Sequence, residues 1–384
     1  MSRSITILGA TGSIGSSTLD LIRRDRDNWS VEALTANGNA AELARLAREF
    51  CAKVAVIADE SRLPELRDAL AGSGIEAAGG AGALVEAGAR GADMTIAAIV
   101  GCAGLAPTMA AIEQGGCIGL ANKEALVSAG DVMTAAVART GATLLPVDSE
   151  HNAIFQCLAG NAHRDVRWIT LTASGGPFRD WTHEQLAAAT PAQAVKHPNW
   201  SMGAKISVDS ATMFNKGLEL IEAWHLFPVG LERLRIIVHP QSIVHSMVEY
   251  RDGSTLAQLG PSDMRVPIAS VLAWPQRMDT PCEPLDLASI GTLSFRAADE
   301  DRFPATRLCR EAAEAGGAAP AVLNAANEVA VAAFLAGQIP FTRIATYVAD
   351  LLSCYAPPAP GSLDDVIAVD AEARVRAHAL MESA

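Results

Sequence analysis

Two carboxylates stand close together where an apolar run near the middle of the chain ends. Asp148 and Glu150 follow residues 142–147, which are typical of a buried strand. In an extended segment, residues two apart project to the same face, so the two carboxylates would lie side by side. Like charges held together are costly unless a cation or proton relieves them, and oxygen ligands without nearby Cys or clustered His favour Mg²⁺ or Mn²⁺ over Zn²⁺. The alternative is a pair of solvated acids at a strand end.

A helical segment later in the chain could supply a third carboxylate. Asn215, Lys216 and Glu219 stand at positions i, i+1 and i+4, so they share one helix face. That face would offer an amide, an ammonium and a carboxylate to a ligand. Alternatively, Lys216 and Glu219 form an exposed ion pair of small energetic value.

Three glycines follow the first apolar run of the chain. Gly9, Gly12 and Gly15 lie between that run and a helical segment. Such a loop lets the backbone approach a pyrophosphate, while the helix N-terminus offers N–H donors. Because the spacing is GxxGxxG and not GxGxxG, a dinucleotide site and a glycine-rich turn both stay open.

The loop after the second apolar run bears on the choice between NAD and NADP. Asn37, Gly38 and Asn39 stand where an NAD site usually carries a carboxylate for the ribose 2′-hydroxyl. Glu32 lies too early, inside the strand, to play that part. The loop therefore favours NADP, although it has no Arg or Lys to hold the 2′-phosphate.

Polar residues also follow the fifth apolar run. Asn122, Lys123 and Glu124 would lie at the crevice of a parallel sheet, where the Lys could contact substrate oxygens and the polar pair could face the nicotinamide ribose. An ordinary helix start explains the same residues without a ligand.

The elements that position these residues can be read from hydrophobic periodicity. Between residues 5 and 148, six short apolar runs alternate with longer stretches rich in Ala, Leu, Glu and Arg. Buried parallel strands read as continuous apolar runs. We therefore expect an α/β fold, in which residues 1–150 form a doubly wound, Rossmann-like parallel sheet of about six strands that binds its ligand at the carboxyl strand ends.

The rest of the chain has a different pattern of apolar and polar residues. Residues 151–280 mix strands and turns and predict an α+β catalytic domain. Residues 281–304, with Pro, Asp and Leu and no clear periodicity, predict a linker. Residues 305–384 are Ala-rich with helical spacing and predict a C-terminal α-helical domain.

Composition limits the classes of partner and compartment. The net charge of −13 opposes binding to nucleic acid or to an anionic membrane, although a locally positive pocket can still hold a small phosphorylated ligand. Seven scattered cysteines without a CxxC pair suggest neither a disulfide framework nor a zinc cluster, and favour a reducing cytoplasm. The first strand begins within a few residues of Met1, so we expect no signal or transit peptide.

Taken together, several segments closely resemble the deoxyxylulose phosphate reductoisomerases. The segments are GATGSIG (9–15), ANKEALVSAG (121–130), PVDSEHNAIFQ (146–156), LTASGGPF (171–178), the stretch from HPNWSMG to LELIEA (197–223) and VHPQSIVHSMVEYRDGS (238–254). They occur in order over the first two expected domains. Residues 324–341 are similar to that family's helical domain.

The resemblance implies a chemistry and a set of site residues. The family rearranges 1-deoxy-D-xylulose 5-phosphate, a small phosphorylated ketose, and reduces the product with NADPH to 2-C-methyl-D-erythritol 4-phosphate in the non-mevalonate isoprenoid pathway. It uses Mg²⁺ or Mn²⁺, with Co²⁺ as a further candidate, and forms homodimers. The implied metal ligands are Asp148, Glu150 and Glu219, and the implied contacts with the substrate's carbonyl and hydroxyl oxygens are Lys123, Ser149 and Glu150.

The resemblance also implies which residues bind the substrate phosphate and which bind NADPH. The implied phosphate pocket consists of Ser174, Ser210, Asn215 and Lys216, with His197 nearby, and the implied NADPH contacts are Thr11, Gly12, Ser13, Ile14, Asn122, Glu124 and Gly203. Residues 197–203 have the composition of a lid, in which Trp200 and Met202 would cap the substrate. One departure concerns Ala36-Asn37-Gly38-Asn39, because many family members resemble A-x-(K/R)-N there.

Two other classes remain as alternatives. A semialdehyde dehydrogenase could use the glycine loop with Cys102 as nucleophile, but that chemistry needs no carboxylate cluster. A redox-sensing regulator could bind NADP without turnover, which would leave the expected metal ligands and lid unexplained.

Overall fold

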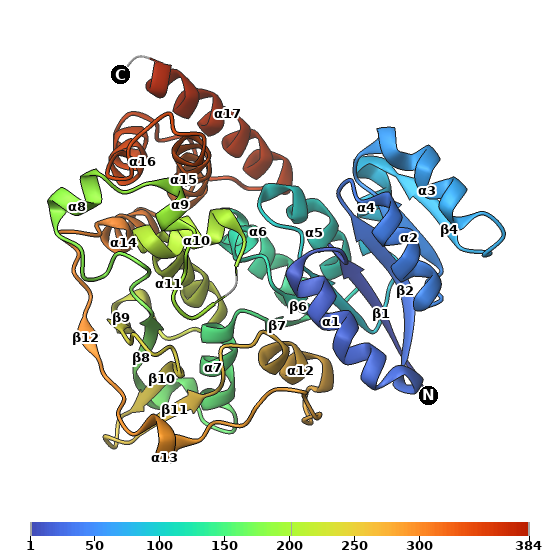
Figure 1. Ribbon diagram of the computed structural model, residues 1–384, viewed down its shortest axis with the longest axis horizontal. Helices are drawn as coiled ribbons and strands as arrows, with labels where there is room; N and C mark the ends of the chain where they lie inside the picture. The colour runs from blue at the N-terminus through green and yellow to red at the C-terminus, as the bar shows by residue number, and fades with distance from the viewer. Residues whose placement is uncertain (1, 201, 383–384) are drawn as a thin grey trace. The chain divides into compact units, whose positions relative to one another are not determined.

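The computed structural model describes residues 2–200 and 202–382. The chain folds into two compact units (Figure 1). The first comprises residues 1–125, 133–152 and 264–282, and the second comprises residues 126–132, 153–263 and 283–384. Each unit has its own sheet, so each is described by itself.

The first unit contains a parallel sheet of seven strands in the order β4-β3-β2-β1-β5-β6-β7. The strands are β1 Arg3–Leu8, β2 Trp29–Ala36, β3 Val54–Ile57, β4 Glu76–Gly79, β5 Met94–Ala97, β6 Cys117–Leu120 and β7 Thr143–Pro146. Six of them are the expected apolar runs. The seventh, β4, was missed because Glu-Ala-Ala-Gly is small, partly polar and poor in β-forming side chains.

Helices connect these strands as a doubly wound sheet requires. The helices are α1 Ser13–Arg24, α2 Ala40–Glu49, α3 Leu63–Leu70, α4 Gly80–Gly88, α5 Leu105–Glu113, α6 Lys123–Thr140, the start of α7 Ser149–Leu158, and α12 Arg265–Ala273. Short 3₁₀ turns are η1 Arg26–Asn28, η2 Glu60–Arg62 and η3 Cys102–Gly104. On α2, Leu43, Leu46 and Ala47 are buried at helical spacing while the intervening charged side chains face water, which explains why this segment folds as a surface helix.

One segment departs from the expected domain boundaries. Residues 264–280 were expected within the domain over 151–280 and residues 281–282 within the linker, but all belong to the first unit, where α12 packs against α1, β6 and β7. Arg3 Nη1 donates to Leu272 O at 2.6 Å, which ties β1 to this returning helix. The local sequence pattern gave no sign of this return, because a largely apolar helix such as α12 can pack against either sheet.

The second unit contains a mixed five-stranded sheet in the order β11-β10-β8-β9-β12. The strands are β8 Val166–Ala173, β9 Leu234–Val238, β10 Val244–Tyr250, β11 Thr255–Leu259 and β12 Arg296–Ala297. Only β8 and β9 pair in parallel; the other pairs are antiparallel. The expected α+β texture after residue 150 is therefore confirmed.

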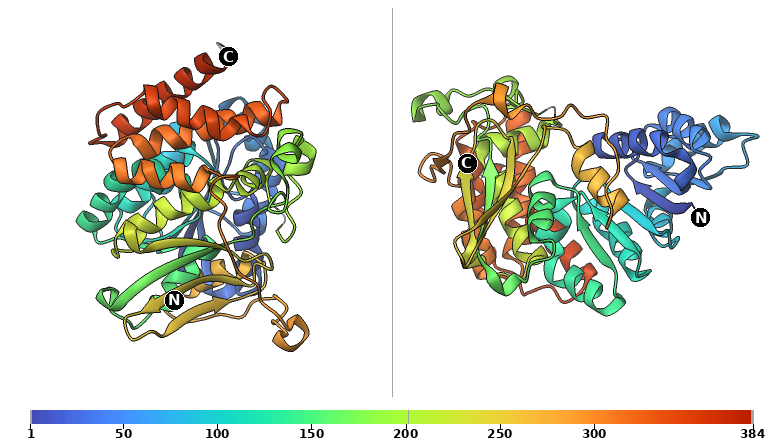
Figure 2. Two further views of the ribbon diagram at one scale, coloured as in Figure 1. Left: turned by 90° about the vertical axis from the view of Figure 1, so that its left-hand side faces the viewer. Right: turned by 90° about the horizontal axis from the view of Figure 1, so that it is seen from below.

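Helices of the second unit form layers above this sheet. The helices are α8 His183–Ala187, α9 Pro191–Ala194, α10 Ala204–Thr212, α11 Phe214–Leu226, α13 Leu287–Ile290, α14 Ala305–Ala315, α15 Ala319–Leu335, α16 Arg343–Cys354 and α17 Leu363–Glu382, with 3₁₀ turns η4 His163–Asp165 and η5 Leu231–Arg233. In the left view of Figure 2 the C-terminal helices, orange to red, form the outer layer of this unit, and α11 contacts both the sheet and α14. The expected C-terminal helical region is confirmed.

The second unit's core holds α11 in place. Phe214, Leu218 and Ile221 are fully buried in a cluster that also contains Phe334 of α15. Each such side chain stabilises the fold by about 1.5–3 kcal/mol relative to an exposed one. Over residues 2–200 and 202–382, no helix is long and apolar enough to cross a membrane.

Candidate active site

The glycine loop after β1 allows the start of α1 to lie very close to the end of that strand. Gly9 has φ of +90°, a conformation that L side chains rarely adopt, and Gly12 is the N-cap of α1. A Cβ placed on Gly15 would lie 2.3 Å from Gly9 O, so only glycine lets α1 start so close to the strand. The first-turn N–H groups of α1 have no acceptor within the helix, which leaves donors for an anion. This geometry favours the dinucleotide interpretation over that of a plain turn.

The loop after β2 contains the residues expected near a ribose phosphate. The side chain of Asn39 accepts a hydrogen bond from Glu42 N at 3.1 Å and so caps α2. A Cβ on Gly38 would have Asp59 Oδ2, at 3.9 Å, as its only close neighbour. Glu32 is paired with Lys53 at 2.6 Å inside the sheet, as expected for a residue too early to reach the loop.

The polar residues after β6 begin α6. Asn122 is 2% exposed, and its Nδ2 donates to Gly101 O at 2.9 Å, so its amide fixes the neighbouring loop. Lys123 and Glu124 stand in the first turn of α6, and both are buried. Because these three residues are buried, the interpretation of an ordinary, solvent-exposed helix start is less favoured.

Lys123 and Asp148 meet at the carboxyl ends of adjacent strands. Lys123 follows β6, Asp148 follows β7, and Lys123 Nζ lies 2.6 Å from Asp148 Oδ2. Their side chains are 7% and 12% exposed. A buried charge of this kind is tolerated because its counter-charge is in contact.

The acidic pair itself differs from the expected geometry. Asp148 and Glu150 were expected on one face of an extended segment, but α7 begins at Ser149 and Asp148 Oδ1 accepts from Glu150 N at 3.2 Å. Asp favours this conformation because its short carboxylate can satisfy a first-turn N–H. The carboxylates still converge: Asp148 and Glu150 offer oxygens within 4.8 Å of each other.

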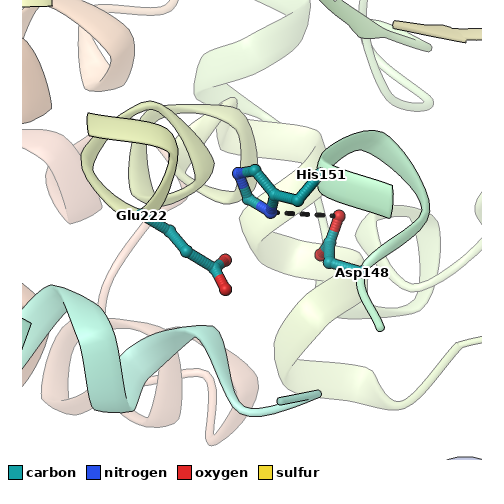
Figure 3. A group of neighbouring side chains, drawn as sticks. All are labelled: Asp148, His151 and Glu222. Atoms are coloured by element: carbon teal, nitrogen blue, oxygen red, sulfur yellow. Dashed lines mark ion pairs between the residues drawn. The ribbon is translucent and has the colours of Figure 1, made fainter. Parts of the chain in front are cut away.

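Two neighbours surround the acidic pair. Ser149 Oγ donates to Glu150 Oε2 at 2.6 Å. His151, which is fully buried, places Nδ1 3.7 Å from Asp148 Oδ1 (Figure 3). The imidazole is thus in a position to orient the Asp148 carboxylate.

In the second unit, Ser174 lies in the loop after β8, next to the end of α10. A Cβ on Gly176 would lie 2.6 Å from Ser210 O, so the glycine brings the Ser174 loop against the backbone of Ser210. Met213, with φ of +68°, joins α10 to α11. The loop at Ser174, the end of α10 and the start of α11 therefore converge within one unit.

The start of α11 carries a buried polar cluster. Asn215 Nδ2 donates to Glu219 Oε1 at 2.5 Å, and Lys216 Nζ pairs with Glu219 Oε2. Lys216 is 3% exposed and Glu219 1% exposed, so the alternative of an exposed ion pair is wrong. Sequence reasoning also missed Glu222, a second buried carboxylate on α11 drawn in Figure 3, because a residue three positions after Glu219 looks like one more helical charge.

The expected lid residues follow α9. His197 Nε2 lies 2.8 Å from Ser174 Oγ. Trp200 stacks obliquely on the buried His245 of β10, with ring centroids 6.0 Å apart. Met202 is partly buried, and Gly203 is the N-cap of α10. Ser201, within the expected lid, lies outside the described residues.

The candidate residues are divided between the two units. The first unit contains the nucleotide loops, Lys123, Asp148, Ser149 and Glu150; the second contains Ser174, His197, Ser210, Asn215, Lys216 and Glu219. Cys102 lies in η3 and is partly buried. A parallel sheet with a glycine loop and a carboxylate cluster at the same edge is typical of an enzyme that binds a dinucleotide.

Comparison with known proteins identifies the family. The model for 1-deoxy-D-xylulose 5-phosphate reductoisomerase matches residues 5–130, and two models for the C-terminal domains of that enzyme match residues 144–227 and 259–376. The reductoisomerase of Zymomonas mobilis is 60% identical over 99% of this chain and 98% of its own length. That of Gluconobacter oxydans is 57% identical, over 99% of this chain and 94% of its own length. The chain belongs to the 1-deoxy-D-xylulose 5-phosphate reductoisomerase family.

Solved structures agree with this assignment. The Zymomonas mobilis reductoisomerase in complex with NADPH has a TM-score of 0.96 at 58% identity and covers both chains completely. A reductoisomerase in complex with NADPH, fosmidomycin and magnesium has a TM-score of 0.93 at 43% identity, over 99% of this chain and 98% of its own. The expected family and fold class are therefore confirmed, and the dehydrogenase and regulator alternatives fall away.

Proposed function

We propose that this chain is an NADPH-dependent enzyme that converts 1-deoxy-D-xylulose 5-phosphate into 2-C-methyl-D-erythritol 4-phosphate with the help of a divalent metal. The observation that carries this proposal lies within the first unit. Because all seven strands are parallel, the glycine loop after β1 and the acidic pair after β7 lie at one edge of one sheet. A hydride donor and a metal that binds the substrate can thus share that edge.

NADPH is assigned to the glycine loop and the β2 and β6 loops. Thr11, Gly12, Ser13 and Ile14 would bind its pyrophosphate at the N-terminus of α1, a helix that Gly15 allows to start close against the loop after β1. Asn37, Gly38 and Asn39 would surround the 2′-phosphate, and Asn122, Glu124 and Gly203 would contact the nicotinamide half. When bound, NADPH supplies the hydride that reduces the rearranged aldehyde.

The metal is assigned to Asp148, Glu150 and Glu219. Three carboxylates suit a hard cation, and the convergence of Asp148 and Glu150 supports the assignment. We assign Mg²⁺ as the resident ion, with Mn²⁺ as a substitute and Co²⁺ as a further candidate. When bound, the metal polarises the substrate's carbonyl and lowers the pKa of the adjacent hydroxyl.

Lys123, Ser149 and Glu150 are assigned to the reacting oxygens. Lys123 points its ammonium at the carboxylate cluster, where it can stabilise negative charge that develops on a substrate oxygen. The Ser149 hydroxyl donates to Glu150 and can turn to a substrate hydroxyl instead. These groups orient the carbon chain before the rearrangement begins.

The substrate phosphate is assigned to Ser174, Ser210, Asn215 and Lys216. The N-terminus of α11, a helix of 13 residues, favours an anion there, and Lys216 adds a charge that burial makes stronger. His197 would support this pocket through Ser174, while Trp200 and Met202 would cover the carbon chain and exclude water. Phosphate binding then holds the short substrate in register with the reacting groups.

The proposal includes an oligomeric state and a compartment. We assign a homodimer, which sedimentation at several protein concentrations can measure. We assign a reducing cytoplasm, which suits seven scattered cysteines without a CxxC pair, of which Cys309 is fully buried.

An absorbance assay at 340 nm tests the function. NADPH should be oxidised only when 1-deoxy-D-xylulose 5-phosphate and Mg²⁺ are both present, and EDTA should stop the reaction until excess Mg²⁺ is restored. NADPH binding without oxidation under these conditions would contradict the proposal.

A further inference from the structure

Beside the expected phosphate pocket, a turn of chain organises a histidine. His197 Nδ1 accepts two backbone N–H groups, from Asn199 at 3.2 Å and from Trp200 at 3.0 Å. A ring nitrogen that accepts hydrogen bonds carries no proton, so the proton of the neutral imidazole must be on Nε2. The turn therefore selects one tautomer of His197.

The tautomer decides the role of Ser174. His197 Nε2 lies 2.8 Å from Ser174 Oγ, so this contact must be an N–H donated to the hydroxyl oxygen. Gly176 N donates to the same oxygen at 3.0 Å. A hydroxyl oxygen accepts two hydrogen bonds and donates one. Since both acceptor positions are filled, the Ser174 proton is available only for an acceptor outside this group.

Asn199 fixes the turn on which this arrangement depends. Its Nδ2 donates to Pro240 O at 2.6 Å and to Ser242 Oγ at 3.0 Å. The 239–243 turn is itself held, because Ser242 N donates to His239 O at 3.1 Å and His239 Nε2 accepts from Ile243 N at 3.2 Å. The amide of Asn199 thus joins the His197 turn to a rigid corner of the same unit.

We propose that Asn199 is a positioning residue that holds His197 as the Nε2–H tautomer and thereby makes the Ser174 hydroxyl an obligatory hydrogen-bond donor to the substrate phosphate. A phosphate dianion offers only acceptors, so a serine locked as a donor matches it, whereas a serine free to rotate must first be oriented. This inference rests on the proposed phosphate role of Ser174.

Histidine ¹⁵N NMR tests the tautomer directly. In the full-length enzyme labelled with ¹⁵N-histidine, and with the His197 signals assigned by their loss in His197→Gln, Nδ1 should show the shift of an unprotonated nitrogen and Nε2 that of a protonated one. In Asn199→Ala both signals should move toward tautomer-averaged positions. A protonated Nδ1 in the unaltered enzyme would overturn the proposal, and this measurement needs no variant at position 199 to fold.

Kinetics test the consequence. Asn199→Ala should raise KM for 1-deoxy-D-xylulose 5-phosphate by about tenfold, the worth of one charge-assisted hydrogen bond, with kcat nearly unchanged. Ser242→Ala, which removes only one of the two acceptors, should give a smaller change in the same direction. Asn161→Ala is the matched control, because Asn161 Nδ2 donates to Ala159 O in an exposed turn of the same unit. An unchanged tautomer and KM in Asn199→Ala overturn the positioning role.

Ser174→Ala separates this proposal from the phosphate assignment. If Ser174→Ala binds substrate as tightly as the unaltered enzyme, the phosphate role of Ser174 is wrong and the last step of the inference falls with it. If Ser174→Ala binds at least about tenfold more weakly while Asn199→Ala keeps the tautomer and KM, only the role of Asn199 is wrong.

Discussion

The Lys123 ammonium lies 2.6 Å from the Asp148 carboxylate, and the two side chains come from the ends of neighbouring parallel strands. The proposed chemistry needs both charges. The Lys123 ammonium would stabilise a developing oxyanion, and the Asp148 carboxylate would bind the metal cation. Each charge also reduces the energetic cost of burying the other. A double variant that removes both charges should therefore recover stability without recovering activity.

Lys123→Met should abolish turnover and destabilise the fold. Removing one partner of a buried ion pair costs about 3–5 kcal/mol, because the Asp148 carboxylate loses the ammonium that contacts it at 2.6 Å. The double variant Lys123→Met with Asp148→Asn should regain most of that stability and none of the activity. Urea unfolding without metal measures the first effect, and equal stability of the single and double variants would contradict the coupling.

Glu219→Gln should make turnover undetectable in a protein that still folds, at some cost in stability because Glu219 also neutralises the buried Lys216 ammonium. The amide keeps the size of the side chain but lacks the charge that a hard cation requires. Mn²⁺ binding, followed by electron paramagnetic resonance, should weaken by at least about tenfold, the loss expected when a ligand's charge is removed. Glu232→Gln is the control, since Glu232 is 75% exposed in the same unit. Activity retained at saturating Mn²⁺ would exclude Glu219 as a ligand.

Lys216→Met should act mainly on substrate binding. Lys216 is 3% exposed at the start of α11, so the loss of its proposed contact with phosphate should raise KM by about 100-fold, equivalent to roughly 2–3 kcal/mol. Lys196→Met, at an exposed position of the same unit, should leave KM unchanged. An unaltered KM in Lys216→Met would remove Lys216 from the phosphate pocket.

Gly38→Arg should strengthen the preference for NADPH. A Cβ at this position has only Asp59 Oδ2 within 4 Å, at 3.9 Å, so a side chain can begin here without a clash. An added guanidinium next to a phosphate should tighten NADPH binding by about tenfold and leave NADH binding unchanged. Fluorescence titrations with both nucleotides measure the ratio, and a parallel gain for NADH would contradict a 2′-phosphate contact.

Stability should fall as the pH drops through the titration of His225. Burial lowers the pKa of this imidazole below its ordinary value of 6.5, while Asp131 opposes that shift. The unfolded chain therefore takes up a proton at a higher pH than the folded protein does. The stabilisation is complete above pH 6.5 and is lost as the pH falls below it.

The contribution of His225 can be isolated by comparing variants. His225→Gln should flatten the decline in urea-unfolding free energy between about pH 7 and pH 5, the range in which a histidine titrates. His378→Gln, at an exposed position on α17, should not flatten it. Identical pH profiles for His225→Gln and the unaltered chain would rule out this contribution.

The sequence predicted those parts of the fold that depend on local periodicity. Apolar runs located six strands of the first sheet, and the glycine spacing located the nucleotide loop, because both patterns reflect contacts between near neighbours. The strand β4 and the return of α12 to the first unit were missed, since short Ala- and Gly-rich strands and long-range packing leave little trace in local pattern.

For the candidate site, residue spacing alone did not decide whether the polar side chains are buried or exposed. Asn215, Lys216 and Glu219 could not be told from an exposed helix face, because nothing within α11 itself reports that Phe334 of α15 and its neighbours cover that helix. Likewise, the start of α7 at Ser149 depends on a cap that Asp148 provides, which a strand-based interpretation overlooks. Whether a side chain is buried depends on segments far away in the sequence. Before the structure, only the family resemblance therefore favoured a site role for these residues over an exposed helix face.

The hydrogen bonds from Asn215 and Lys216 to Glu219 place the proposed anion and cation contacts on one helical turn. Under the proposed assignment, a substitution on this turn alters the anion contact and the cation contact together. The two halves of substrate binding are therefore coupled through a few residues of α11 and cannot be changed one at a time.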